Sequence, residues 1–164
     1  MNLKAYLNDL SRRRYLSRLP KKRMGAGCLF FDDCGRLLIL KPTYKNNWLL
    51  PGGVIEADES PRQACIREVK EEMGINCQPT RLLCVDYVSD SSYKIESVQF
   101  VFYGGTISHK TKITLPDKEI ANYQFAESSE ALSMLGIHSQ RRLTSCLPHL
   151  DSQTTVYLEN GYQP

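Results

Sequence analysis

GGVIEADESPRQACIREVKEEMGI, residues 52–75, decides the fold of this 164-residue chain. Two glycines open the stretch, a helix start follows, and Glu68, Glu71 and Glu72 come together near its end. Three carboxylates within about one and a half helical turns repel each other. The glutamates are therefore either the solvated acidic face of an ordinary amphipathic helix or a set of ligands for a cation.

The middle of this stretch carries the signals of a helix over about Pro61–Met73. Ser60 can cap its start, proline suits the first helical position, and Gln63 completes a capping box. Gly74 supplies the left-handed residue that commonly ends a helix. These signals are local, so they predict the helix without knowledge of the rest of the fold.

The three glutamates share an arc of about 100° on this helix. Their arc adjoins the apolar face, and no basic residue follows Glu71 or Glu72 four positions later. Carboxylate oxygens grouped in this way suit a hard divalent cation, Mg²⁺ or Mn²⁺. The preceding Leu50–Gly53 loop ends in two glycines, which let backbone groups approach a metal or a phosphate closely.

The remaining pattern predicts one mixed α/β domain. A Gly104-Gly105 pair is expected to end one of its strands, and the tail 151–164 is ambiguous. Strands are predicted over Met24–Phe31, Arg36–Lys41, Arg81–Ser89, Ile95–Tyr103 and Tyr123–Phe125, and further helices over Glu127–Leu135 and Ser139–Leu147.

The first 24 residues form a basic leader. They hold eight Lys or Arg residues and one acid, Asp9, whereas the rest of the chain holds 13 basic and 17 acidic residues. Leu3, Leu7 and Leu10 have helical spacing, and Pro20 ends the pattern. Three interpretations stay open: a helix that covers the sheet edge, a segment that holds an anionic substrate or a dimer partner, or a segment that binds RNA or a membrane surface.

Composition narrows the class of protein. No apolar run reaches the length of a membrane span, and the leader lacks the apolar core of a secretory signal, so we expect no membrane insertion and a cytoplasmic location. The six cysteines form no CxxC pair and lie mostly in apolar segments. They are expected to be reduced, buried thiols rather than zinc ligands or disulfides.

The residues of the opening stretch resemble the Nudix box, G-x5-E-x7-R-E-U-x-E-E-x-G-U, where U is aliphatic. All nine defined positions match: Gly53, Glu59, Arg67, Glu68, Val69, Glu71, Glu72, Gly74 and Ile75. The resemblance to a MutT-like Nudix domain extends over roughly residues 22–147. It implies an α/β/α sandwich around a mixed β-sheet over residues 22–164, preceded by a basic helical extension over residues 1–21.

The resemblance also implies roles for the acidic residues. Glu71 and Glu72 correspond to direct metal ligands, and the Gly52 carbonyl corresponds to a backbone ligand. Glu68 corresponds either to a further ligand or to the base that activates water, because family members differ at this point. The implied cofactor is Mg²⁺ or Mn²⁺.

Two further positions follow from the same resemblance. Arg67 is expected to pair with Glu59 and to lock the helix against the loop, since an arginine can grip a carboxylate with two hydrogen bonds. Many relatives use one more acid from a downstream loop. Glu119 is the candidate here, with Glu96 as a weaker one, although an exposed loop acid of no catalytic role is the ordinary interpretation of Glu119.

The implied reaction is metal-dependent attack of water on phosphorus in a small nucleoside diphosphate linked to another group. Three alternatives remain: a non-catalytic nucleotide-binding module, a hydrolase of RNA 5′ ends, and an isopentenyl diphosphate isomerase. A homodimer is also possible. The sequence does not select the appended group, although Tyr93 has a spacing seen in dinucleoside polyphosphate hydrolases. Aromatic residues that could stack on a base are Tyr44, Trp48, Tyr87 and Phe102.

Overall fold

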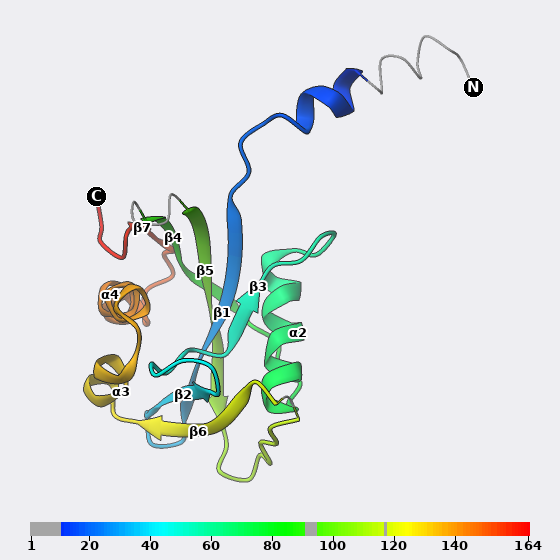
Figure 1. Ribbon diagram of the computed structural model, residues 1–164. Helices are drawn as coiled ribbons and strands as arrows, with labels where there is room; N and C mark the ends of the chain where they lie inside the picture. Colours follow the sequence, from blue (N-terminus) through cyan, green and yellow to red (C-terminus); the bar gives the residue numbers. More distant parts are fainter. Residues whose placement is uncertain (1–10, 91–94, 117) are drawn as a thin grey trace.

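The computed structural model of the chain describes residues 11–90, 95–116 and 118–164. Within these ranges, seven strands form one mixed sheet in the order β6-β2-β1-β5-β4-β7, and the short β3 pairs with β1. Helix α2 covers one face of the sheet, and α3 and α4 cover the other (Figure 1). The predicted α/β/α sandwich around a mixed sheet is confirmed. The strands are β1 (Arg23–Asp32), β2 (Leu37–Pro42), β3 (Gly52–Val54), β4 (Arg81–Asp90), β5 (Ile95–Ile107), β6 (Ile120–Ala126) and β7 (Val156–Glu159); the helices are α2 (Pro61–Met73), α3 (Ser128–Met134) and α4 (Ile137–Cys146), followed by a 3-10 turn, η1 (Leu147–His149).

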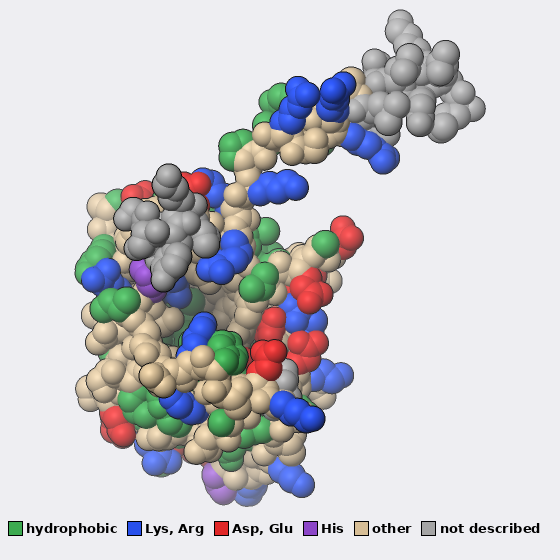
Figure 2. All heavy atoms as spheres, in the orientation of Figure 1, with side chains coloured by type: hydrophobic (Ala, Val, Ile, Leu, Met, Phe, Trp, Pro, Cys, Tyr) green, Lys and Arg blue, Asp and Glu red, His purple; other side chains and the backbone are tan. Residues whose placement is uncertain are grey.

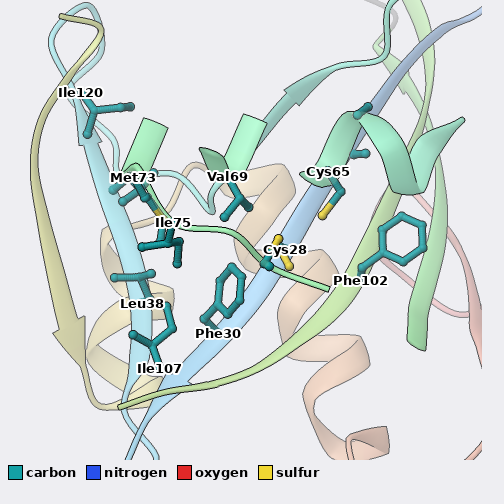
Figure 3. Packing of buried hydrophobic residues seen from close by; sticks show 14 of the residues in the cluster. Cys28, Phe30, Leu38, Cys65, Val69, Met73, Ile75, Phe102, Ile107 and Ile120 are labelled. Carbon is teal, nitrogen blue, oxygen red and sulfur yellow. The ribbon is translucent and has the colours of Figure 1, made fainter. Parts of the chain in front are cut away.

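Both faces of the central strands are buried, which explains their nearly continuous apolar sequence. In β2, Leu38 and Leu40 pack beneath α2, while Leu37 and Ile39 point to the opposite side, toward α3 and α4. Figure 3 shows the first of these two cores, where Val69 and other α2 side chains face the sheet. The apolar arc of α2 is thus buried, as its periodicity predicts.

The Gly104-Gly105 pair does not end β5, contrary to the prediction. The strand continues to Ile107, and the register against β1 shifts between Leu29 and Phe30. A Cβ atom on Gly104 would lie 2.2 Å from Cε1 of Phe30, so only glycine lets the bulged strand pass this buried ring. A bulge, rather than a strand end, is the reason for the two glycines.

The ambiguous tail supplies β7, which pairs in parallel with β4. A buried ion pair anchors this region: Arg142 Nε on α4 donates to Asp86 on β4 at 2.8 Å, and the second Asp86 oxygen accepts from the Gly161 N–H at 2.9 Å. Burial without compensation would be costly for either charge. The tail is therefore held against β4 and α4.

The predicted leader lies partly outside the described residues, which begin at Ser11. Residues 11–16 are helical, and every residue from 11 to 24 is exposed. This segment projects from the sandwich at the start of β1 (Figure 1). At the base of this segment, the Lys22 ammonium pairs with Glu96 on β5, and Arg23 is the first residue of β1.

The six cysteines are free thiols, and all but Cys34 are buried, as predicted. Cys28 on β1 and Cys65 on α2 lie between the helix and the sheet (Figure 3). In the described ranges, no helix has both the length and the hydrophobicity needed to cross a bilayer.

Candidate active site

Helix α2 begins and ends where its sequence signals predict. The Ser60 side chain accepts from the Gln63 N–H at 3.2 Å, and the Gln63 side chain accepts from the Ser60 N–H at 2.8 Å. Gly74 closes the helix with a left-handed backbone, φ 68°. These caps fix the register of the helix, and so they fix the direction in which its glutamates point.

Strand β3 places two glycines directly beneath α2. Gly52 pairs with Gly27 and has φ 139°, and a Cβ atom there would lie 2.2 Å from the Ala26 carbonyl oxygen. A Cβ atom on Gly53 would lie 2.4 Å from Oε1 of Glu68. The backbone of β3 therefore touches the Glu68 carboxylate without an intervening side chain, which only glycine allows.

Glu72 is buried, with 8% of its surface exposed. Its Oε2 accepts a hydrogen bond from the Gly52 N–H at 2.8 Å. An ionised carboxylate of low exposure requires such bonds because water no longer solvates it. This bond orients Glu72 toward the loop that carries the Gly52 carbonyl.

Arg67 organises the acidic residues around it. Its guanidinium grips Glu59 with bonds of 2.7 and 3.1 Å, and it also donates to Glu68 at 2.9 Å and to Glu71 at 3.0 Å. A fifth bond reaches the Val54 carbonyl at 3.0 Å. The pair implied by the family resemblance, Arg67 with Glu59, is present.

Arg67 also corrects the expectation that the cluster lacks a basic partner. The sequence offers no basic residue four positions after Glu71, but Arg67 lies four positions before it and bridges Glu68 and Glu71. The bonds that Arg67 donates to Glu59 come first among the causes that raise the pKa of Arg67, and the same bonds lower the pKa of Glu59. The repulsion between carboxylates is thus partly offset by the protein itself.

The three glutamates differ in environment. Burial raises the pKa of Glu68, and the neighbouring Arg67 opposes that rise. The Glu71 side chain is 53% exposed and so reaches solvent. In the ranges 11–90, 95–116 and 118–164, no three acidic, histidine or cysteine side chains already converge as a metal site. The donor chemistry nevertheless fits Mg²⁺ or Mn²⁺, because carboxylate oxygens stand beside a glycine backbone that a Cβ would block.

A pocket of about 280 Å³ opens beside this cluster. Gly52 and Gly53 belong to its wall, and two exposed cationic residues, Arg23 and Lys45, line it. Arg142 lines it too, but its charge is already paired with Asp86. Figure 2 shows acidic side chains gathered over α2 and the preceding loop, on the face that also carries the basic N-terminal segment. Cations within the pocket and carboxylates at its edge match a phosphate group bound through a divalent ion.

A larger cavity of about 930 Å³ lies at the other end of β1. Phe31, Arg81 and Tyr103 line it, and none of its lining residues belongs to the carboxylate cluster. Arg81 donates there to the backbone carbonyls of Leu150 and Ser152. Volume alone would favour this cavity as the substrate site. The smaller pocket is the better candidate, because it lies beside the carboxylates that can bind a metal ion.

The predicted acids outside the box have other surroundings. Glu119 lies just before β6, where its backbone carbonyl accepts from Thr43 N–H at 2.8 Å, and it is absent from the described lining of the smaller pocket. Glu96 pairs with Lys22 and accepts from the Tyr87 hydroxyl. The backbone of Glu119 thus bonds to Thr43, the residue that precedes the pocket residue Tyr44. Glu96 instead pairs with Lys22 of the basic leader.

The aromatic residues predicted to stack on a base lie in different parts of the structure. Tyr44 lines the pocket, whereas Phe102 is buried and Trp48 packs against the core under α3 and α4. Tyr93 lies outside the described residues. No sequence pattern points to Gln99 and Phe100, which reach the pocket because β5 pairs in parallel with β1.

A model of the NUDIX domain family matches residues 21–145. Similar curated proteins include a MutT-like protein of Streptomyces ambofaciens, 44% identical over 57 residues (35% of this chain, 36% of that protein). Diphosphoinositol polyphosphate phosphohydrolase 2 of Homo sapiens is 36% identical over 77 residues (45% and 42%). The m7GpppN-mRNA hydrolase of Saccharomyces cerevisiae is 28% identical over 86 residues (52% and 8%). The matches thus span less than half of each relative.

Solved structures share the fold. The mutator MutT protein of Bacillus halodurans superposes with a TM-score of 0.66 at 22% identity, covering 87% of this chain and 91% of that one. A NUDIX hydrolase of Nitrosomonas europaea gives a TM-score of 0.69 at 18% identity, covering 87% and 80%. At these identities the likeness establishes the fold alone.

Proposed function

Because the chain belongs to the NUDIX domain family, we propose that it is a metal-dependent pyrophosphohydrolase. Its substrate would be a small nucleoside diphosphate derivative, and water would attack phosphorus to give two phosphorylated fragments. One observation carries the proposal: Arg67 fixes Glu59, Glu68 and Glu71 beside Gly53, at the edge of a pocket lined by cationic side chains.

The ligands of the metal would be Glu68, Glu71, Glu72 and the Gly52 carbonyl. When bound, Mg²⁺ or Mn²⁺ would offset the charge of the diphosphate and lower the pKa of a bound water. The protein holds these ligands in place: the Gly52 N–H bonds to Glu72, and Arg67 bonds to the other two glutamates. Such supporting bonds restrict the orientation of each carboxylate.

Two residues are candidates for the base that accepts a proton from the attacking water. Glu68 is the first, because its carboxylate lies against the Gly53 backbone and is 17% exposed. Glu119 is the second, because its loop is bonded to Thr43 next to the pocket. No covalent intermediate is required, since water itself supplies the attacking oxygen.

The pocket accounts for the rest of the substrate. Arg23 and Lys45 can contact phosphate oxygens, and the rings of Tyr44 and Phe100 offer surfaces for a base. Gln99 reaches the same pocket with an amide that can both donate and accept. These residues favour a nucleotide over an inorganic diphosphate.

The test is hydrolysis of a nucleotide panel with Mg²⁺ or Mn²⁺, by the wild-type protein and by Glu72→Gln. The panel contains ADP-ribose, sugar nucleotides, dinucleoside polyphosphates, canonical and oxidised dNTPs, and NADH. Metal-dependent cleavage of one member, lost in the variant, supports the proposal. If a folded, metal-binding protein cleaves none of them, a non-catalytic nucleotide-binding module or an enzyme for RNA ends becomes the better hypothesis.

Three further expectations belong to the proposal. We propose that the extension ends at residue 21 and the domain begins at residue 22; a protein without residues 1–21 should then retain nucleotide hydrolysis. A homodimer would be detected by sedimentation. A cytoplasmic location would be tested by fractionation of cells that express the full chain.

A further inference from the structure

Residues 11–23, which we name the basic arm, carry seven cationic residues and no acidic one. All thirteen are exposed. Figure 2 shows the Lys and Arg side chains along this arm on the same face as the acidic cluster. Cations crowded at this density repel each other, so the arm is suited to a partner that carries a regular series of negative charges. The cations are Arg12, Arg13, Arg14, Arg18, Lys21, Lys22 and Arg23.

The helical part of the arm, residues 11–16, has no continuous apolar face. Successive residues are about 100° apart, so Arg12, Arg13 and Arg14 cover more than half of the helix circumference. Tyr15 and Leu16 are exposed, and Arg12 lies between them around the helix. A helix that lies on a bilayer needs a separate apolar face to bury. The arrangement therefore favours a solvated polyanion over a membrane surface.

The base of the arm is fixed beside the pocket. The Lys22 ammonium pairs with Glu96 and lies 5.7 Å from the centre of the Tyr87 ring. Arg23 and Met24, the next residues, line the pocket together with Gly52 and Gly53. A charged chain that leaves the pocket past Arg23 would thus meet the arm directly.

We propose that the basic arm binds the phosphodiester backbone of single-stranded RNA whose 5′-terminal phosphates occupy the pocket. The phosphodiester links of a nucleic acid contain no anhydride bond, whereas a 5′ end that began as a nucleoside triphosphate does, and RNA chains begin in this way. Beyond Arg23 the arm extends about 25–30 Å, which exceeds a mononucleotide. Exposed Tyr15 can add stacking on a base to the charge contacts.

The reaction would be the proposed hydrolysis applied to an RNA end, so this inference rests on the proposed function. Water adds across one anhydride bond: its oxygen bonds to phosphorus, and the bridging P–O bond breaks. The leaving phosphate keeps that electron pair, and the proton of the water passes to the catalytic base. The arm takes no part in this step; it holds the RNA and thereby favours a long substrate over a free nucleotide.

The experiment measures binding of a 12-nucleotide RNA with a 5′-triphosphate to the full chain carrying Glu72→Gln, by fluorescence anisotropy at several salt concentrations. The test variant adds Arg12→Gln, Arg13→Gln and Arg14→Gln. The matched control instead adds Lys110→Gln, Lys112→Gln and Lys118→Gln, three exposed cations of the loop between β5 and β6. Both triple variants change the net charge by the same amount.

We expect the arm variant to bind this RNA about tenfold or more weakly at 50 mM salt, with the slope of log affinity against log salt smaller by about 2. The control variant should match its parent. Without Glu72→Gln, the arm variant should hydrolyse a free nucleotide at the wild-type rate. The same RNA with a 5′-hydroxyl should bind more weakly than the triphosphate form.

Equal RNA affinity of the two triple variants would overturn the inference, even if nucleotide hydrolysis is intact. So would equal affinity for the two RNA ends, or arm-dependent binding to phosphatidylserine vesicles in place of RNA. Binding of the RNA end through the arm, without cleavage of any nucleotide or RNA end by the wild type, would support the arm and overturn the proposed hydrolysis.

Discussion

The Glu72 carboxylate accepts a hydrogen bond from the backbone N–H of Gly52, 2.8 Å away and twenty residues earlier in the chain. The bond joins the last turn of α2 to the start of β3. A single contact thus connects the helix that carries the acids to the loop that borders the pocket.

We expect Glu72→Gln to lower kcat by orders of magnitude while the protein stays folded. A glutamine oxygen can still accept from Gly52, so the free energy of unfolding should change by only about 1 kcal/mol. The loss of a negative ligand removes affinity for the cation. Rates with Mg²⁺ and thermal unfolding, with Glu130→Gln on α3 as control, measure both effects. An active Glu72→Gln enzyme would contradict the assignment.

Binding of the divalent cation should increase the thermal stability of the protein. A cation that binds only the folded state raises the free energy of unfolding by about 2.7 kcal/mol at one hundred times its Kd. Addition of Mn²⁺ should therefore raise the Tm of the wild-type protein and of Glu130→Gln, and chelation should reverse the rise. In Glu72→Gln the rise should be much smaller; an equal rise would place the ion elsewhere.

Gly53→Ala should reduce activity far more than stability. The added Cβ would lie 2.4 Å from Oε1 of Glu68, and the carboxylate can move away cheaply because it ends a flexible side chain. Its displacement would disturb the metal ligands and the candidate base together. Gly136→Ala adds a methyl group no closer than 3.5 Å to its neighbours, Asn47 atoms, and should retain activity. Wild-type rates for Gly53→Ala would show that the position of Glu68 is unimportant.

Arg67→Lys should lower both activity and stability. Lysine cannot reproduce the two-pronged grip on Glu59 together with bonds to Glu68, Glu71 and Val54. We expect a loss of about 1–3 kcal/mol in the free energy of unfolding by chemical denaturation. Arg36→Lys is the matched control, because Arg36 grips Asp32 far from the site. Equal kcat losses in both variants would argue against a specific role of Arg67.

The pKa of Glu59 lies below its usual value of 4.5 because Arg67 donates to its charged form. A carboxylate with a lower pKa in the folded state adds stability that is present above its unfolded pKa. That stability is lost as the pH falls through the folded pKa. The Tm difference between wild type and Glu59→Gln should thus be largest near neutral pH and shrink below about pH 4. A difference that grows on acidification would contradict this origin.

The local structure of α2 could be predicted from sequence because its causes are local. Ser60, Gln63 and Gly74 act on backbone groups within a few residues, so the limits of the helix follow from their order alone. The apolar run Leu37–Leu40 predicts a strand for the same reason. The prediction that the Gly104-Gly105 pair ends β5 was wrong because a bulge and a strand end can have the same local sequence. Here the Phe30 ring on another strand is the reason for the glycine at position 104.

The sequence by itself determined the caps of α2, the order of the acidic residues along it and the basic character of residues 11–23. Tertiary structure alone decided that Gly52 bonds to Glu72, that Gly53 lies under Glu68, and that the helical part of the arm projects from the sheet. It also decided, through parallel pairing of β1 with β5, that Gln99 joins the pocket. The reason is physical: helix signals act over four residues, whereas strand pairing joins residues whose separation along the chain has no local trace.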